Sequence, residues 1–490
     1  MPHSINIAGL FPGQNISIPT VTSLSDDSRH VKTGGLFVAI KGNSSNGELH
    51  IPQAINNGAI VIVTSENYDQ TLPPNITHLK TASPRMMLSA LSRLFYPEHP
   101  ETTVAVTGTN GKSSVAHFIR QIWSQLGYRA ASIGTLGITT SAGAKEKNQK
   151  LELTSPGPLQ LHKTLHTLAS EQHITHCIFE ASSHALDQHR IDSASLSAAA
   201  FTNLSQDHLD YHNTMQSYFD AKLRLFTELL PPGKPAVLNA DTDKYQDLLE
   251  NSQGAGHKVF SYGKKGGNLK LLSISHATDN CSLTIEINGS QYHTTSPFSA
   301  YFQIENILCA ASIAISLGEK PEEVIKCIPL LNAPPGRMEL IGKTKKNASV
   351  FVDFAHTPDA LERTLQELRV QTTNKLHVVF GCGGDRDQGK REPMGRIAHE
   401  IADEIYITDD NPRSEDRAVI RNQIKAAAPN AYDNEDRQLC ILHALNNLEN
   451  GDILLVAGKG HETVQIINAQ HIPFDDRQII KTYLGKEVIS

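Results

Sequence analysis

A short glycine-containing loop between an apolar run and a patterned helix constrains this chain more than any other feature. The loop reads Thr-Gly-Thr-Asn-Gly-Lys-Ser-Ser over residues 107–114 and follows the apolar run 102–106. After it, apolar residues recur at helical spacing from Val115 to Leu126, which predicts an amphipathic helix. A strand, a glycine turn and a helix that opens with Lys-Ser are typical of a phosphate-binding loop, in which backbone amides and the helix N-terminus hold phosphate oxygens.

The residues of this loop predict a nucleoside triphosphate and Mg²⁺. We expect Lys112 to reach the outer phosphates and the hydroxyl of Ser113 to ligate the metal. Two residues rather than four separate Gly108 from Gly111, so the loop is a shortened variant of the common pattern. The alternative is a glycine turn that caps an ordinary helix. That alternative does not explain why a lysine lies among the turn residues.

Composition is typical of a globular protein with several domains. The 490 residues are 39% hydrophobic and 19% charged, with a net charge of −7 and no block of lysine or arginine, which argues against a nucleic-acid partner. The six cysteines are scattered without a C-x-x-C pair, so we expect reduced thiols in a cytosolic protein. No apolar run approaches the ~20 residues that span a bilayer. We also expect a monomer that acts on small molecules.

Strand and helix patterns divide the chain into three segments of α/β type. Residues 1–88 carry short β-like runs, and residues 89–331 alternate strands with helices around the phosphate loop. A linker at 332–336 then opens a third segment, 332–490, with further buried strands. These patterns predict a smaller α/β N-terminal domain, a central doubly wound sheet of the P-loop type and a C-terminal parallel sheet.

Polar clusters stand at the C-terminal ends of the predicted strands. They lie at 108–114, 180–184 and 203–208 in the central segment, and at 353–356, 381–387, 409–413 and 458–462 in the last. Open α/β sheets bind their ligands at that edge. We therefore expect two ligand-binding sheets whose working edges face a shared cleft.

Three polar residues of the central segment have more than one interpretation. Glu180 and His208 each follow a predicted strand and are suited to hold Mg²⁺ around a triphosphate. A helix-capping carboxylate and a hydrogen-bonded loop histidine are the alternatives. Lys222 lies in a predicted helix with one apolar stripe, where a lone lysine is ordinarily solvated or salt-bridged.

An ordered set of motifs resembles the Mur ligases, the ATP-dependent amino-acid ligases of bacterial peptidoglycan synthesis. The motifs are T-G-T-N-G-K-S-S, E-A-S-S-H-A-L-D-Q-H-R, F-T-N-L-S-Q-D-H-L-D-Y-H, Y-F-D-A-K-L-R-L-F, G-R-M-E, D-F-A-H-T-P-D-A-L, F-G-C-G-G-D-R-D-Q-G-K-R, D-D-N-P-R and A-G-K-G-H-E. The resemblance extends from Asp27 to Glu462. It implies an N-terminal domain that holds a UDP-sugar, a central domain that holds ATP, and a C-terminal Rossmann-like domain that holds the incoming amino acid.

The resemblance also implies roles for single residues. ATP would be bound by Gly108, Thr109, Asn110, Gly111, Lys112, Ser113, Ser114, Asn306 and Arg337. Mg²⁺ would be held by Ser113, Glu180, His208 and Lys222, the last modified to a carbamate. The catalytic set would be Lys112, Lys222, His208, Glu180 and His356. A nearby Mg²⁺ favours the neutral lysine amine, which can react with CO₂.

Two further groups of residues would hold the other substrates. The UDP-muramoyl-peptide would be bound by Ser28, Asn43, Ser44, Ser45, Thr154, Ser155, Ser182, Gln188 and Arg190. The amino acid would be bound by Arg386, Asp410, Asn411, Pro412, Arg413, Gly458 and Glu462.

The run Asp-Asn-Pro-Arg at 410–413 is typical of the family members that add meso-diaminopimelate rather than lysine. This amino acid carries a second carboxylate at its far end, and an arginine fork pairs such a group bidentately. Arg386 would add a second positive charge, while Glu462 and the Gly458 carbonyl would accept an ammonium. The alternative for Arg413 is a structural salt bridge to Asp409 or Glu415.

The implied reaction is a two-step ligation. The γ-carboxylate of D-Glu in UDP-N-acetylmuramoyl-L-Ala-D-Glu attacks the γ-phosphate of ATP, and the diaminopimelate amine then displaces phosphate. His356 or Asp353 would orient that amine, and the linker at 332–336 would serve as a hinge for domain closure. The alternatives are a lysine-adding Mur ligase, a folylpolyglutamate or cyanophycin synthetase, and a P-loop ATPase without ligation chemistry.

Overall fold

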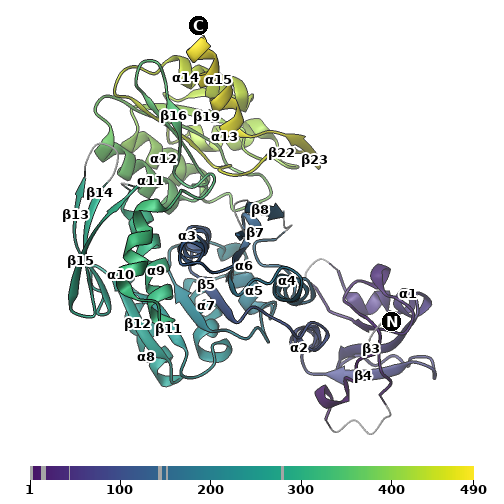
Figure 1. The fold of residues 1–490 in the computed structure, drawn as a ribbon. Helices are drawn as coiled ribbons and strands as arrows, with labels where there is room; N and C mark the ends of the chain where they lie inside the picture. Colours follow the sequence, from purple (N-terminus) through teal and green to yellow (C-terminus); the bar gives the residue numbers. More distant parts are fainter. Residues whose placement is uncertain are drawn as a thin grey trace.

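Three main sheets follow one another along the chain. The computed structural model describes residues 4–12, 18–42, 45–141, 146–149, 153–276, 281–298 and 300–489. Figure 1 shows the purple N-terminal sheet at one end of the molecule, the yellow-green C-terminal sheet at the other, and the central sheet between them. The predicted α/β fold class is confirmed.

The N-terminal sheet is small and wholly parallel. Its strands, in spatial order, are β1 (Leu24–Ser25), β2 (Gly35–Val38), β3 (Ala59–Ser65) and β4 (Thr77–Thr81). They are accompanied by η1 (Ala8–Leu10), η2 (Ser28–His30), η3 (Gly47–His50), α1 (Ile51–Asn56) and α2 (Pro84–Phe95). Ser83 caps α2 by accepting from the Met86 amide. The predicted division after residue 88 falls inside α2, whose buried Leu88 and Leu91 belong to the N-terminal core.

The central sheet has a parallel core with antiparallel extensions at both edges. The core strands, in spatial order, are β12 (Lys258–Gly263), β11 (Pro235–Asn239), β10 (Ala198–Phe201), β5 (Thr102–Thr107), β9 (His176–Glu180) and β6 (Ala130–Gly134). Beyond β6 lie β7 (Gly137–Ser141) and β8 (Glu146–Gln149), and beyond β12 lie β13 (Leu269–His276), β14 (Cys281–Ile287) and β15 (Ser290–Ser296). The phosphate loop therefore leaves β5, near the middle of the sheet.

Helices cover both faces of the central sheet. One face packs against α3 (Lys112–Gln125), α9 (Tyr301–Ser316), α10 (Pro321–Cys327) and η5 (Ile328–Leu330). The other packs against α4 (Pro158–Ser170), α5 (Ser183–Asp187), α7 (Met215–Arg224), the π-helical turn η4 (Leu225–Leu229) and α8 (Tyr245–Gly254), and the short α6 (Leu209–His212) precedes α7. Successive residues of β5 enter opposite cores, Val104 one and Ala105 the other, as strand geometry requires.

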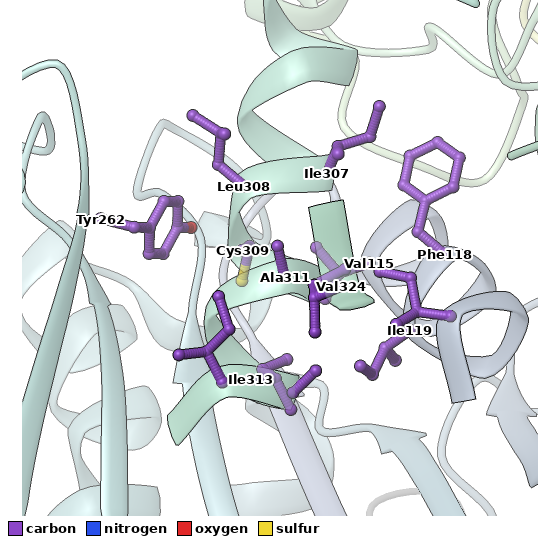
Figure 2. Packing of buried hydrophobic residues seen from close by; sticks show 14 of the residues in the cluster. Val115, Phe118, Ile119, Tyr262, Ile307, Leu308, Cys309, Ala311, Ile313 and Val324 are labelled. Atoms are coloured by element: carbon purple, nitrogen blue, oxygen red, sulfur yellow. The ribbon is translucent and has the colours of Figure 1, made fainter. Parts of the chain in front are cut away.

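From Ile307 onward, helix α9 (Tyr301–Ser316) is almost entirely apolar and is enclosed in the core. Figure 2 shows its Ile307 and Ala311 near Phe118 and Ile119 of α3, while Leu308 lies near Tyr262 of β12. A helix that is hydrophobic all round belongs in a core. Truncating such a side chain to alanine costs about 2–5 kcal/mol of the free energy of unfolding. The packing of α9 on α3 thus fixes the helix that opens at the phosphate loop.

The C-terminal sheet is parallel except at one edge. Its strands, in spatial order, are β16 (Glu339–Lys343), β17 (Ser349–Asp353), β21 (Ile453–Ala457), β18 (Leu376–Phe380), β19 (Glu404–Thr408) and β20 (Tyr432–Asn434), and only β16 is antiparallel. The predicted buried strands at 350–354, 376–381, 404–408 and 453–457 are confirmed. A hairpin of β22 (Val464–Ile467) and β23 (Gln470–Pro473) stands apart from this sheet.

Helices also cover both faces of the C-terminal sheet. One face packs against α11 (Pro358–Gln371), α12 (Arg391–Ile401) and α13 (Arg417–Lys425), the other against α14 (Arg437–Asn446) and α15 (Asp476–Ile489). Among the described residues, none of the helices has the length and apolar character needed to cross a membrane. All six cysteines are buried and free.

Candidate functional site

A cavity of about 1010 Å³ lies between the central and C-terminal sheets. Loops that follow β5, β9 and β10 line it on one side, and loops that follow β17, β18, β19 and β21 line it on the other. These are the C-terminal ends of parallel strands in both sheets. The predicted shared cleft between two working edges is therefore confirmed.

Glycine geometry shapes the phosphate loop. Gly108 and Gly111 have φ angles of 141° and 88°, in a region that other residues rarely adopt. A methyl group at Gly108 would collide with the Thr202 side chain, and one at Gly111 would collide with the amide of Asn306. Asn306 thus lies directly against the loop.

Lys112 is folded back onto the loop that carries it. Its Nζ donates to the carbonyl oxygens of Gly108 at 2.8 Å and Thr109 at 2.7 Å. Burial lowers the pKa of this amine, although the charges of Glu180 and Asp207 oppose that effect. The lysine charge is therefore already located inside the loop, where incoming phosphate oxygens would meet it.

Lys222 lies behind the same loop and is not a surface lysine. Its side chain is 1% exposed, and its Nζ donates to the Gly108 carbonyl at 2.8 Å. The amine also lies 4.4 Å from the ring centroid of Tyr218. Burial, reinforced by the charge of Lys112, places the pKa of Lys222 well below its usual value. The solvated alternative for this residue is excluded.

Glu180 ends β9 and points toward the loop after β6. The Thr135 amide donates to its Oε1 at 2.8 Å, and the Thr135 hydroxyl donates to its Oε2 at 3.1 Å. The following helix is capped by Ser182, whose Oγ accepts from the Ala185 amide at 3.2 Å. Glu180 is therefore not the helix cap that the sequence left open, and it lines the cavity.

His208 lines the cavity in a left-handed backbone conformation. Its φ angle is 54°, and its Nε2 lies 3.4 Å from Oδ2 of Asp207. Burial lowers the pKa of His208, and Asp207 opposes this shift. The described residues contain no group of three or more His, Cys, Asp or Glu side chains that could hold a metal on their own. A Mg²⁺ ion that is also bound by phosphate oxygens and water does not require such a cluster. Of the predicted donors, Ser113, Glu180 and His208 line the cavity.

Arg337 joins the two sides of the cavity. Its Nη2 lies 3.5 Å from Ser113 Oγ, and its guanidinium carbon lies 4.2 Å from the ring centroid of Phe354. Asp353, at the end of β17, accepts from the Met338 amide at 2.6 Å. His356 bonds through Nδ1 to the Phe354 carbonyl at 2.8 Å and lines the cavity.

A second link between the two sides was not predicted from the sequence. Asp359, in the first turn of α11, accepts from Asn110 Nδ2 and from Ser205 Oγ, each at 3.0 Å. Its other oxygen accepts from Arg363 at 3.1 Å. The sequence signal was ambiguous, because an aspartate in a first helical turn is common for helix stability alone.

Arg413 is held in a strained backbone conformation on the C-terminal side of the cavity. Its φ angle is 52°, which is uncommon for a residue other than glycine. Its Nη1 donates to the Gly384 carbonyl at 2.8 Å. The predicted alternative partners are bound to other residues, Asp409 to Arg421 and Arg417, and Glu415 to Arg391. The salt-bridge interpretation of Arg413 is therefore wrong.

Arg386 and Arg413 present two guanidinium groups to one cavity. Both line it. Burial, followed by the charge of Arg386, lowers the pKa of Arg413. Within the described ranges, neither side chain has a carboxylate at salt-bridge distance. Two adjacent positive groups without such a partner are suited to an anionic ligand.

Asn411, Glu462 and Lys459 form a compact hydrogen-bonded group beside Arg413. Asn411 Nδ2 donates to Glu462 Oε2 at 2.9 Å, and Lys459 Nζ donates to the same oxygen at 2.9 Å. Lys459 also donates to Asn411 Oδ1 at 3.0 Å and to the Val464 carbonyl at 2.7 Å. The sequence motif singled out Asn411 and Glu462, but it gave no role to Lys459. Asp410 and Gly458 line the cavity as well.

Two glycines bring the linker at 332–336 against this loop. Gly336 and Gly460 have φ angles of 63° and 54°. A methyl group on Gly336 would collide with the backbone of Gly460 and His461, and one on Gly460 would lie 2.7 Å from the Gly336 carbonyl oxygen. The linker therefore packs directly on the loop that carries Lys459 and Glu462.

Four of the five residues predicted to hold the muramoyl-peptide form a hydrogen-bonded chain, and the fifth, Thr154, bonds to Thr135 at 3.1 Å. Arg190 donates to Gln188 Oε1 at 3.1 Å and to the Ser155 carbonyl at 3.2 Å. Ser155 Oγ donates to Ser182 Oγ at 3.1 Å. Thr154 and Ser182 line the cavity, whereas the other three do not.

The residues predicted to contact the UDP-sugar lie in the N-terminal part. Ser28 is buried, and its Oγ donates to Gln53 Oε1 at 2.6 Å. Ser45 is exposed. Asn43 and Ser44 lie outside the described residues. Neither Ser28 nor Ser45 lines the cavity between the other two sheets, so any UDP contact there would be at a separate surface.

Comparison with known proteins identifies related chains over nearly all of this sequence. Three family models match: "Mur ligase family, catalytic domain" at residues 20–96, "Mur ligase middle domain" at 106–314, and "Mur ligase, glutamate ligase domain" at 336–460. A UDP-N-acetylmuramoyl-L-alanyl-D-glutamate–2,6-diaminopimelate ligase of Mesorhizobium japonicum is 42% identical over 481 residues, 98% of each chain. A protein of the same name from Rhizobium meliloti is 43% identical, over 95% of this chain and 94% of its own.

Solved structures agree with these sequence relatives. A structure of a UDP-N-acetylmuramoyl-L-alanyl-D-glutamate–2,6-diaminopimelate ligase has a TM-score of 0.72 and 29% identity, and covers 99% of this chain and 100% of its own. A MurF ligase of Thermotoga maritima in complex with ADP shares the fold, with a TM-score of 0.62 and 17% identity over 95% and 98% of the two chains. This chain belongs to the Mur ligase family and is an ATP-dependent ligase.

Proposed function

We propose that this protein adds meso-2,6-diaminopimelate to the D-Glu γ-carboxylate of UDP-N-acetylmuramoyl-L-Ala-D-Glu, with cleavage of ATP to ADP and phosphate, in peptidoglycan synthesis. One observation carries this proposal. The cavity has a phosphate loop on one wall and, on the other, two guanidinium groups without carboxylate partners among the described residues. The relatives named above bear the name of this ligase.

In the first step, the γ-carboxylate of D-Glu attacks the γ-phosphate of ATP, and an acyl phosphate and ADP result. Lys112 and the backbone amides of residues 108–114 would offset the charge that develops on the transferred group. Asn306, packed on Gly111, and Arg337, next to Ser113, support the nucleotide side.

Mg²⁺ would be held by Ser113, Glu180, His208 and the carbamate of Lys222, together with phosphate oxygens. When bound there, the ion neutralises phosphate charge. The carbamate would form when the neutral Lys222 amine bonds to the carbon of CO₂ and releases a proton. A fully buried amine beside another lysine favours the neutral form that this reaction needs.

In the second step, the amine of the amino acid attacks the acyl carbon, and phosphate leaves. His356 is the candidate to orient that amine, because it lines the cavity on the C-terminal side. Asp353 is bound to the Met338 amide and is better suited to hold the chain near Arg337.

Specificity for diaminopimelate would come from the second wall. Arg413 and Arg386 would bind the distal carboxylate, while Glu462 and the Gly458 carbonyl would accept an ammonium. Lysine lacks that carboxylate and would leave the two guanidinium groups unpaired, which a partly buried site penalises.

The remaining substrate would extend toward the N-terminal part. We assign the muramoyl-peptide to Thr154, Ser155, Ser182, Gln188 and Arg190, and the UDP-sugar to Ser28, Asn43, Ser44 and Ser45. We further propose three domains. The sequence places them at 1–88, 89–331 and 332–490, and we move the first boundary to the end of α2 at Phe95. A cytosolic monomer is proposed, and the six free, buried cysteines suit a reducing compartment.

Phosphate release by the purified protein tests the proposal. The assay would contain Mg-ATP and UDP-N-acetylmuramoyl-L-Ala-D-Glu, and would compare meso-diaminopimelate with L-lysine. We expect release that requires both the nucleotide-sugar and diaminopimelate, with lysine near background. Equal use of lysine would indicate a lysine-adding ligase, and release that ignores both co-substrates would indicate an ATPase without ligation chemistry.

A further inference from the structure

We propose that Lys459 is a positioning residue of the amino-acid pocket, which holds Glu462 away from Arg413 so that Arg413 stays open to the carboxylate of the incoming amino acid. This inference rests on the proposed function, because it concerns the pocket assigned above to diaminopimelate. It adds a residue that touches neither the amino acid nor ATP but decides how a binding residue is oriented.

All the hydrogen-bonding capacity of Lys459 is directed to the protein. Its side chain is fully buried, with 0% exposure. The ammonium has three N–H groups, and its three acceptors are Glu462 Oε2, Asn411 Oδ1 and the Val464 carbonyl. No donor is left for a substrate. Lys459 can therefore act on the reaction only through its neighbours.

A tight turn brings Lys459 and Glu462 together. The Glu462 amide donates to the Lys459 carbonyl at 2.9 Å. Gly460, which lies between them, is packed against Gly336 and against the Cβ of Phe354. This packing fixes the backbone of the turn, so that Lys459 points inward while Glu462 remains 31% exposed at the cavity.

Glu462 is close enough to Arg413 to matter electrostatically, yet it does not pair with it. Its negative charge raises the pKa of Arg413, and so does that of Asp410, against the larger effect of burial. In the described part of the chain, Arg413 has no carboxylate at salt-bridge distance. Glu462 Oε2 is instead bound by two donors, Lys459 and Asn411, from the side of the loop.

Removal of Lys459 would free a carboxylate beside an unpaired guanidinium. Carboxylates and arginine forks form strong bidentate pairs, so Glu462 would turn toward Arg413. In that pair, Arg413 would no longer be open to the distal carboxylate of the amino acid, and Glu462 would no longer be free to accept its ammonium. Stability alone does not explain such a lysine, because replacing a buried ion pair with apolar groups is often neutral or stabilising.

The test is the kinetics of Lys459→Met, which keeps the length of the side chain but removes its charge and donors. We expect the KM for meso-diaminopimelate to rise about 10- to 100-fold, the equivalent of one lost hydrogen bond to a charged group. The KM for ATP should stay within about twofold, since a change on this wall leaves the phosphate loop intact. Preference for diaminopimelate over lysine should fall in parallel.

A double-mutant cycle with Glu462→Gln shows whether Lys459 acts through Glu462. The substituted amide side chain carries no charge that could pair with Arg413. The double variant should therefore have nearly the same KM for diaminopimelate as Glu462→Gln alone. Independent, additive effects of the two substitutions would contradict the proposed route.

A matched control variant distinguishes the proposed positioning role of Lys459 from a purely structural one. Asp452 is also fully buried, but it precedes β21 whereas Lys459 follows that strand, and it is paired with His377 at 3.1 Å. Asp452→Asn should lower Tm without changing either KM. If Lys459→Met behaves like this control, the proposal is overturned. Should Lys459→Met not fold, Lys459→Gln, whose shorter side chain gives Glu462 no charged partner, must show a raised KM for diaminopimelate for the proposal to stand. If the wild-type protein does not use diaminopimelate at all, the proposed function itself fails.

Discussion

The two walls of the cavity treat their charged side chains in different ways. On the central wall, Lys112 and Lys222 both donate to the Gly108 carbonyl, and Glu180 accepts twice from Thr135. On the C-terminal wall, Arg413 donates to backbone carbonyls and meets no carboxylate in the described residues. The central wall thus supplies hydrogen-bond partners for these three side chains, whereas the other wall leaves the positive charge of Arg413 for a ligand to neutralise.

The difference matches the two ligands proposed for these walls. A triphosphate brings several negative oxygens with a metal, so it can displace internal hydrogen bonds of a loop that is already shaped. A free amino acid brings one distal carboxylate, and a guanidinium engaged by a protein carboxylate would be closed to it. Substitutions of Lys112 and Lys222 can therefore show whether these paired lysines of the central wall take part in the reaction. Substitution of Arg413 can show whether its unpaired charge selects the amino acid.

The largest effect should follow loss of Lys112. Lys112→Met removes the charge that faces the transferred phosphate, and kcat/KM for phosphate release should fall by about 10³-fold or more. Lys326→Met is the control, because Lys326 is exposed and pairs with Glu323, far from the phosphate loop in the sequence. A loss below about tenfold in Lys112→Met would mean that this lysine serves the shape of the loop rather than the chemistry.

Lys222→Met should come next. Its loss removes the proposed carbamate from the metal, and we expect kcat to fall about 100-fold, or roughly 3 kcal/mol of transition-state stabilisation. Protein equilibrated with ¹³C-bicarbonate should give a carbamate ¹³C signal that is missing from the variant. An unchanged signal, or a fall in Tm with kcat preserved, would assign Lys222 to loop support alone.

Arg413→Ala should affect amino-acid use without affecting the nucleotide. We expect kcat/KM for meso-diaminopimelate to fall about 10- to 100-fold, because a charge-assisted hydrogen bond to the distal carboxylate is lost. The KM for ATP should remain near the wild-type value. The ratio of diaminopimelate to lysine use reports on selectivity, and a ratio that survives the substitution would show that Arg413 does not select the amino acid.

The smallest effect concerns pH and Glu305, a cavity residue on the central wall. Burial raises the pKa of Glu305 from 4.5 to about 7, and Arg363 opposes this shift. The folded protein therefore binds this proton more tightly than the unfolded chain, so the free energy of unfolding falls as pH rises from about 4.5 to about 7 and then levels. Glu305→Gln should remove that fall, with a difference of about 1–3 kcal/mol above pH 7.

Chemical denaturation of wild type and Glu305→Gln from pH 5 to pH 8 provides the measurement. The two stability curves should diverge as pH rises, with the variant more stable at the alkaline end. Parallel curves would show that Glu305 gains enough solvent or partners to ionise freely in the folded protein.

Much of the fold could be predicted because its parallel strands are buried on both faces. Runs such as 198–201 and 453–457 are apolar throughout, which is the pattern that buried parallel strands produce. The antiparallel extension was harder to predict. It was not predicted, although strand β14 alternates buried and partly exposed residues, which is the pattern of a strand with one solvated face.

Much of the candidate site could also be predicted, but only where a residue type is tied to one chemistry. Glycines before Lys112 and an arginine after Pro412 are such residues. Lys222 was assigned by resemblance, because helical periodicity cannot show that its amine reaches the Gly108 carbonyl. Asp359 bonds to Asn110, which lies 249 residues away in the sequence, and Lys459 bonds to Asn411, 48 residues away. A local sequence pattern cannot predict such contacts.

The contact between Gly336 and Gly460 has a thermodynamic consequence. The linker at 332–336 touches the loop whose next residues belong to the proposed amino-acid pocket, so a movement of the linker would displace that pocket. A ligand that prefers one geometry of this loop must then prefer the matching geometry of the linker, and the preference is reciprocal. Affinity for the amino acid and the relative placement of the two walls are therefore two measures of a single conformational equilibrium.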